Sequence, residues 1–308
     1  MLKDRSRRGF SAEELKEAVR NRYGALARGE ARSCGLSGSC CGPAVDYPGA
    51  ALQGKMTRMA GYQRQDLEAV PPEAASCSLG CGNPVAMAAL REGDVVLDIG
   101  SGAGLDVLLA SRRVGPAGRV IGLDLTPEMI ERARHNARRA GVSNVEFRLG
   151  DAEDMPVEDE SVDCIISNCV INLAPNKEKV FREAYRVLRP GGRLFISDIV
   201  TRGLPRELRE SVSAWTGCVA GAMEEEDYLA AVRQAGFQQV EVAGRLELKA
   251  HWLSDVVSDW LRDKAGEEQL DITRLPEDLE GKIASVYVSA VKGCRPRLSN
   301  DSLDPLPS

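Results

Sequence analysis

The stretch Asp98-Ile99-Gly100-Ser101-Gly102-Ala103-Gly104-Leu105-Asp106 decides the fold of this 308-residue chain. The apolar run 95–97 precedes it, as in a buried parallel strand. The glycines let the backbone turn sharply and approach a ligand without a Cβ in the way. The apolar pattern after Gly104 indicates a helix. A strand, a glycine turn and a helix N-terminus together predict a site for a nucleotide-like ligand.

Strands and helices alternate after this motif, which predicts an α/β fold with a doubly wound, Rossmann-like sheet and helices on both faces. Thr126 and Pro127 mark the start of the helix after the second strand. A helix at 177–188 should stop before Pro190. Ligands in such sheets lie beyond the carboxyl ends of the strands. The strands are expected at 95–99, 119–123, 145–149, 162–167 and 193–199.

The rest of the chain is expected to form a Cys-rich N-terminal extension and a smaller C-terminal region. In the extension, Ser11 and Glu14 predict a capping box for a packing helix at 12–27. Later helices are expected at 206–216 and 224–235, and strands at 237–243 and 284–291. The chain is therefore divided into five parts. The N-terminal extension covers 1–75, and a nucleotide-binding domain covers 76–205. A further region at 206–245 is followed by the C-terminal region at 246–294 and a disordered tail at 295–308.

Composition narrows the function. A net charge of -6 argues against nucleic acid as a partner, because phosphate binding needs clustered positive charge. No signal peptide or membrane span is visible, so a cytoplasmic location is expected. The chain has nine cysteines and two histidines. In a reducing compartment the cysteines are thiols, and the scarcity of histidine limits general-base chemistry.

The acidic residues at the strand ends favour S-adenosylmethionine as the cofactor. Asp124 ends the second strand and can accept hydrogen bonds from both hydroxyls of a ribose, although helix capping is the alternative. The G-x-G-x-G pattern after Asp98 departs from the G-x-G-x-x-G that seats a pyrophosphate. A carboxylate there suits an ammonium and a sulfonium. Expected cofactor contacts are Asp98, Gly100, Ser101, Gly102, Gly104, Asp124, Leu125, Asp151, Ala152 and Asn168, with Asp151 and Ala152 near the adenine.

The cysteines fall into two classes. Cys40 and Cys41 are adjacent on a glycine-rich loop, and glycines flank Cys81, a pattern typical of exposed thiols. Cys77 and Cys81 resemble half a zinc site, but no second pair completes it. Cys169 follows the fourth strand, at the edge where the cofactor is expected. Cys164, inside that strand, is predicted to be core, and Cys294 incidental.

Four segments identify a more specific resemblance: residues 78–84 around Cys81, 96–102 in the glycine motif, 167–173 around Cys169, and 218–222 after Thr216 and Gly217. With them the chain resembles the arsenite methyltransferases, a branch of the S-adenosylmethionine-dependent class I methyltransferases. Gly61-Tyr62 and the Cys40-Cys41-Gly42 loop also fit that branch. The similarity runs from about residue 18 to 245.

The resemblance implies roles for particular residues. Cys169 and Cys218 would bind trivalent arsenic as thiolates, and Cys81 would be a third ligand or a disulfide partner. Cys40 or Cys41 would join a redox cycle, and Tyr62 would close over the cofactor. The implied substrates are arsenite and methylarsenite, the implied partner is a thiol reductant such as thioredoxin or glutathione, and the implied role is arsenic detoxification.

The chemistry is consistent with this residue set. Soft trivalent arsenic prefers thiolate ligands, and its lone pair can attack a sulfonium methyl without a base. The transfer oxidises the arsenic, and neighbouring thiols can return two electrons by closing a disulfide. Two alternatives stay open: a methyltransferase for an organic acceptor, whose cysteines merely pack, and a non-enzymatic thiol protein that sequesters or senses metalloid.

Overall fold

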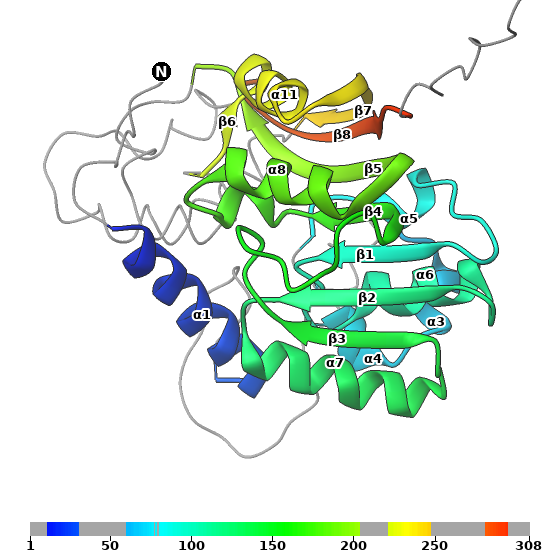
Figure 1. The fold of residues 1–308 in the computed structure, drawn as a ribbon. Helices are drawn as coiled ribbons and strands as arrows, with labels where there is room; N and C mark the ends of the chain where they lie inside the picture. The colour runs from blue at the N-terminus through cyan, green and yellow to red at the C-terminus, as the bar shows by residue number, and fades with distance from the viewer. Residues whose placement is uncertain are drawn as a thin grey trace, which may run out of the picture.

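The computed structural model describes residues 11–30, 60–76, 78, 80–203, 221–247 and 281–294. Eight strands form one sheet in the order β3-β2-β1-β4-β5-β8-β7, with β6 beside β5 (Figure 1). The strands are β1 (Val95–Ile99), β2 (Arg119–Asp124), β3 (Val145–Leu149), β4 (Val162–Asn168), β5 (Leu188–Thr201), β6 (Met223–Glu224), β7 (Phe237–Glu247) and β8 (Ile283–Lys292).

Helices cover both faces of this sheet (Figure 1). The described helices are α1 (Ala12–Arg28), α3 (Arg64–Glu68), α4 (Pro72–Ser76), α5 (Pro84–Met87), α6 (Leu105–Val114), α7 (Pro127–Ala140), the 3-10 turn η1 (Ile171–Leu173), α8 (Lys177–Val187) and α11 (Glu225–Gln234). The doubly wound α/β fold is therefore confirmed.

Two large apolar clusters form the core, one on each face of the sheet, and a smaller third cluster lies where α1 meets α7. On one face α8 and α11 pack on the sheet, and the rings of Phe181 and Tyr228 meet edge to face with centroids 5.3 Å apart. On the other face α6 and α7 contribute Leu108 and Ile130, together with α4 and α5. Because both faces of the central strands are covered, those strands are apolar throughout rather than alternating.

Local sequence signals account for the helix ends. Ser11 and Glu14 form the expected capping box of α1, and Gly29 ends that helix in a left-handed conformation. Thr126 lies at the N-cap of α7 with Pro127 next, but its side chain makes no capping bond. The proline and the preceding extended residue therefore set that helix start.

The fifth strand departs from the prediction. The helix at 177–188 ends one residue early, and β5 starts at Leu188 instead of residue 193. Leu188 pairs with Val162, and the pairing then jumps to Arg193 opposite Cys164. The four residues between form an irregularity in which Gly191 has φ +80°. The Pro-Gly-Gly sequence thus interrupts the ladder instead of preceding it.

The C-terminal strand occupies an unexpected place in the sheet. The first five strands are mutually parallel, as predicted. β8, however, inserts between β5 and β7 and is antiparallel to both, so this half of the sheet is mixed rather than parallel. Strands from the regions 206–245 and 246–294 therefore belong to the same sheet as the nucleotide-binding domain.

Several predictions fall on residues outside the described ranges. They are the helix at 206–216, the tail at 295–308, and the cysteines Cys40, Cys41, Cys77 and Cys218. Among the helices that the structure describes, none has both the length and the apolar character needed to cross a membrane.

The core assignment predicts a stability difference between two truncations. Ile165, in β4, is fully buried, whereas Leu246, in β7, is 41% exposed. Ile165→Ala should lower the free energy of unfolding by about 2–5 kcal/mol, because it removes packed methyl groups and leaves a cavity. Leu246→Ala should change it by less than about 1 kcal/mol. Urea titrations of both variants would measure this, and equal losses would contradict the assignment.

Candidate functional site

A pocket lies at the carboxyl ends of β1, β2, β3 and β4, with about 1020 Å³ of empty space, part of it open to solvent. This is the edge where ligands of doubly wound sheets bind. Most of the predicted contact residues line it: Gly100, Ser101, Gly102, Asp124, Leu125, Asp151, Ala152 and Asn168, together with Cys169.

The glycine turn after β1 shapes the floor of the pocket. Gly100 and Gly102 have φ of +77° and +52°, a region that favours glycine. A Cβ on Gly100 would lie 2.1 Å from Val170, while one on Gly102 would meet nothing within 4 Å. The hydroxyl of Ser101 is buried and has no hydrogen-bond partner among the described residues. The turn thus presents open backbone and one unsatisfied hydroxyl to a ligand.

Three predicted contacts lie behind the pocket wall instead of on it. Asp98 and Gly104 do not line the pocket, and Gly104 packs near Phe147 and Ala133. Tyr62 is fully buried, and its hydroxyl donates to Asp106 Oδ1 at 2.6 Å. In this structure these residues support groups that do line the pocket, and their direct contact with the cofactor stays a prediction.

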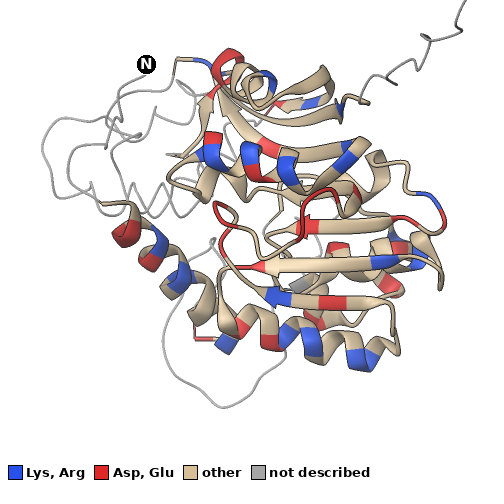
Figure 2. Cartoon of the chain, viewed as in Figure 1, with Lys and Arg blue, Asp and Glu red and all other residues tan. Residues whose placement is uncertain are grey.

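Carboxylates concentrate at this edge of the sheet. In Figure 2 the ribbon is red at several positions in the loops at the carboxyl ends of the strands, and blue positions lie along the outer helices α7 and α8. Burial, followed by the charges of Asp106 and Asp124, raises the pKa of Asp98 well above its usual range. Burial raises the pKa of Asp106 to about 6, against the hydrogen bonds from Tyr62 and Asn168. This field favours a cationic ligand.

Asp124 is held by the local backbone. Its two carboxylate oxygens accept hydrogen bonds from Gly102 N at 2.8 Å and Thr126 N at 2.9 Å. Burial raises its pKa, and these backbone donors lower it in part. Since each carboxylate oxygen has a second lone pair, the group keeps the capacity to accept from a ligand. The capping alternative and the ligand role are thus compatible.

The helix α1 covers one side of the pocket, which the sequence did not reveal. Lys16, Val19 and Tyr23 line the pocket. The Lys16 ammonium lies 2.6 Å from Asp151 and 3.0 Å from Glu153. The carboxylate expected near an adenine is therefore paired with α1. The available signal was the i, i+3, i+7 spacing of the three residues, which puts them on one helix face.

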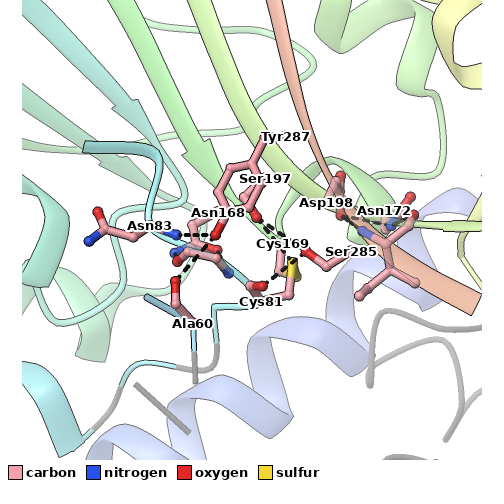
Figure 3. The surroundings of a disulfide bond; sticks show 12 residues. Ala60, Cys81, Asn83, Asn168, Cys169, Asn172, Ser197, Asp198, Ser285 and Tyr287 are labelled. Atoms are coloured by element: carbon pink, nitrogen blue, oxygen red, sulfur yellow. Dashed lines mark hydrogen bonds between the residues drawn. A yellow bond between two sulfur atoms is a disulfide. The ribbon is translucent and has the colours of Figure 1, made fainter. Parts of the chain in front are cut away.

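A disulfide joins Cys81 to Cys169, with a Cα–Cα distance of 5.9 Å across 88 residues of sequence (Figure 3). Cys169 is buried, has φ +58°, and its N–H donates to Ser197 O at 2.8 Å. A non-glycine residue with such a φ is uncommon and strained, so the surrounding contacts must hold this backbone in place. Cys81 is half-buried, which corrects the expectation of an exposed thiol: its flanking glycines permit close packing rather than exposure.

Asn168 connects the pocket to the Cys81 loop. Its Nδ2 donates to Gly82 O at 2.6 Å, and its Oδ1 accepts from Gly82 N at 3.2 Å. The same Nδ2 lies 3.0 Å from the hydroxyl of Tyr62 and 3.3 Å from Asp106 Oδ2. The side chain that precedes Cys169 therefore fixes the loop that carries Cys81.

The remaining described cysteines lie apart from this site. Cys164 is fully buried in β4, and burial raises the pKa of its thiol to about 12, as suits a core residue. Cys294 is exposed. Within the described residues, no cluster of three His, Cys, Asp or Glu side chains could hold a metal ion.

Comparison with known proteins identifies the family. A family profile described as a methyltransferase domain matches residues 90–236. The structure resembles that of an arsenic(III) S-adenosylmethionine methyltransferase from Chlamydomonas reinhardtii, with 31% identity, a TM-score of 0.56, and coverage of 82% of this chain and 76% of that one. The chain belongs to the arsenic methyltransferase family.

Curated arsenite methyltransferases are also similar to this chain in sequence. The arsenite methyltransferase of Halobacterium salinarum is 45% identical over 82% of this chain and 63% of its own length. The human arsenite methyltransferase is 35% identical over 64% of this chain and 55% of its own length. The chain thus spans about three fifths of the length of the curated relatives that it matches.

The pocket residues fit the cofactor of this family, S-adenosylmethionine. The buried, unpartnered Ser101 hydroxyl is available to a polar group, and the open backbone of Gly102 leaves room for close approach. The carboxylates of Asp106 and Asp124 line the pocket and suit the two cationic groups of the cofactor.

The α1 contact predicts a change in cofactor affinity. Lys16→Met removes the ion pairs with Asp151 and Glu153 while keeping the length of the side chain. Without these ion pairs, α1 should be packed over the pocket for a smaller fraction of the time. The Kd for S-adenosylmethionine should therefore rise by about three- to tenfold. Titration calorimetry would measure it. Arg20→Met, which removes an exposed pair with Glu13, is the matched control and should leave the Kd unchanged.

The raised pKa of Asp106 predicts that the affinity for the cofactor depends on pH. Its pKa is raised to about 6, so it holds its proton below pH 6 and carries a negative charge above it. Affinity for the cationic cofactor should therefore increase between pH 5 and pH 7.5, and Asp106→Asn should flatten that increase. Calorimetric titrations at several pH values would test this. A wild-type affinity that does not change with pH would contradict the assignment.

Proposed function

We propose that this chain transfers a methyl group from S-adenosylmethionine to trivalent arsenic that is bound by Cys81, Cys169 and Cys218. The observation that carries the proposal is the meeting of two sulfur atoms, from residues 88 apart in sequence, beside the cofactor pocket. Cys169 lines that pocket. Two thiols that can form a bond to each other can also share one soft ion when they are reduced.

The chain between Gly221 and Cys218 is short enough to permit the third cysteine to reach this site. Cys218 lies outside the described residues and three positions before Gly221. A Cβ on Gly221 would lie only 2.0 Å from the backbone oxygen of Asn172, so the two backbones touch. Asn172 is itself three residues after Cys169. Three extended residues span about 10–11 Å, a reach that supports a shared site for the two cysteines.

The pocket residues would hold the methyl donor. When bound, S-adenosylmethionine supplies an electrophilic methyl group on a sulfonium. Asp106 and Asp124 would balance its positive charges, and Ser101 would donate to or accept from its polar end. Fixed carboxylates in a largely buried site hold their position without reorganisation, which favours a defined orientation of the methyl group.

The reaction requires placement more than proton transfer. The lone pair of thiolate-bound arsenic forms the arsenic–carbon bond, and the carbon–sulfur bond breaks with its electron pair on sulfur. No proton has to be removed, so no general base is needed. The ligating thiolates and the pocket must hold arsenic and methyl carbon about 3–3.5 Å apart and in line.

Methyl transfer leaves arsenic formally pentavalent, and two electrons must return it to the trivalent state. Two thiolates can supply them by closing a disulfide, and the Cys81–Cys169 disulfide is a pair of suitable composition. A thiol reductant such as thioredoxin or glutathione would reopen it. Cys40 or Cys41 would take part in this exchange. The reducing cytoplasm is the proposed location, and arsenic detoxification the proposed role.

Serine substitutions test the function. Cys169→Ser should abolish arsenite methylation, because the hydroxyl is a poor ligand for soft arsenic, while the Kd for S-adenosylmethionine should stay within about threefold. Cys294→Ser, an exposed cysteine outside the site, is the matched control and should retain full activity. Product speciation after incubation with arsenite, cofactor and a thiol would measure it. Full methylation by Cys169→Ser would contradict the proposal.

A further inference from the structure

Three hydroxyl groups on β5 and β8 surround the Cys81 loop, and we refer to Ser197, Ser285 and Tyr287 as the hydroxyl shelf (Figure 3). Ser285 Oγ donates to the backbone oxygen of Cys81 at 2.9 Å. Ser197 Oγ lies 3.6 Å from Cys81 Sγ and 3.4 Å from Ser285 Oγ. The shelf therefore contacts both the backbone and the sulfur of Cys81.

Tyr287 fixes the chain on the far side of the loop. Its hydroxyl accepts from Asn83 N at 3.1 Å and donates to Ala60 O at 3.3 Å. A single side chain of β8 thereby ties together the segment before Tyr62 and the segment after Cys81. The N–H of Asn83 would lose its described partner without this hydroxyl.

The loop reaches the shelf only because glycine flanks the cysteine. A Cβ on Gly82 would lie 2.0 Å from Ser197 Oγ and 2.7 Å from the Tyr287 hydroxyl. A Cβ on Gly80 would lie 2.2 Å from Asn168 Nδ2. The backbone on both sides of Cys81 is thus pressed against side chains, and it cannot shift toward them.

The pairing of β5 with β8 sets this arrangement. Ser197 is the partner of Tyr287, and Ser285 is the partner of Ile199, in the antiparallel register. Residues two apart on a strand share a face, so Ser285 and Tyr287 point to the same side of the sheet. Ser197 also accepts, through its backbone oxygen, the N–H of Cys169. One strand pair therefore holds both cysteines.

We propose that Ser285 and Tyr287 are positioning residues that hold Cys81 beside Cys169 in the dithiol as well as in the disulfide state. They touch neither cofactor nor arsenic in this proposal, and they act through the loop. The thiol–disulfide part stands on the observed contacts alone, whereas the part that concerns arsenic rests on the proposed function. Holding the loop raises the effective concentration of one thiol at the other.

Loss of either hydroxyl should therefore act on equilibria that join the two sulfurs. In Ser285→Ala and in Tyr287→Phe the reduced loop samples more positions. The equilibrium constant for closing the Cys81–Cys169 disulfide should fall by up to about fivefold for each variant, because the reduced loop gains freedom that the disulfide state lacks, and one lost neutral hydrogen bond sets the upper limit. The Kd for arsenite should rise by a similar factor, while the Kd for S-adenosylmethionine stays within about twofold.

The experiment uses the full chain in glutathione buffers of defined redox ratio. Alkylation followed by peptide mass spectrometry gives the fraction of Cys81 joined to Cys169. Ser111→Ala is the matched control, because Ser111 is a buried serine whose hydroxyl also donates to a backbone oxygen, that of Leu108, outside the site. Thermal unfolding of each variant separates local loosening from general destabilisation.

The outcomes are distinct. A disulfide equilibrium that shifts in both shelf variants and not in Ser111→Ala supports the proposal. An equilibrium equal to wild type in Ser285→Ala and Tyr287→Phe, or an equal shift in Ser111→Ala, overturns it. A wild-type chain that binds and methylates no arsenite would refute the proposed function, and the disulfide equilibrium would still decide the role of the shelf.

Discussion

The site depends on the contact of a glycine-flanked loop with the carboxyl ends of two neighbouring strands. β4 delivers Asn168 and Cys169, β5 delivers Ser197, and both amide atoms of Asn168 bind Gly82 beside Cys81. Parallel pairing aligns these strand ends at one edge of the sheet. Because a Cβ on Gly82 would clash with Ser197, the approach of the loop is a property of its sequence. Two sulfurs distant in the chain are thereby held at one wall of a pocket.

The acidic residues at this edge of the sheet favour a cationic ligand over an anionic one. Asp98, Asp106 and Asp124 are largely buried at one edge, and burial raises the pKa of each. When they are ionised, Asp106 and Asp124, which line the pocket, repel a pyrophosphate and attract a sulfonium and an ammonium. Tyr62 and Asn168 both bind Asp106, and Asn168 also binds Gly82 in the loop of Cys81. One connected set of hydrogen bonds therefore joins the charged wall of the pocket to the loop that carries Cys81.

Short-range sequence patterns predict much of the fold and of the site. The glycine turn, the order of the parallel strands and the position of Cys169 follow from short-range sequence signals, and the cofactor class follows from acids at strand ends. Two features depend on distant partners and were not readable. The insertion of β8 between β5 and β7 requires antiparallel pairing across long stretches of chain. The tie from Lys16 to Asp151 joins residues 135 positions apart. The sequence could likewise not choose between ligand and disulfide partner for Cys81.

X-ray absorption at the arsenic edge tests the central claim most directly. The chain would be reduced with a phosphine and loaded with one equivalent of arsenite, so that every sulfur neighbour of arsenic comes from the protein. A site built from Cys81, Cys169 and Cys218 predicts three sulfur atoms in the first shell. A first shell made of oxygen atoms, with no sulfur neighbour, would contradict the account.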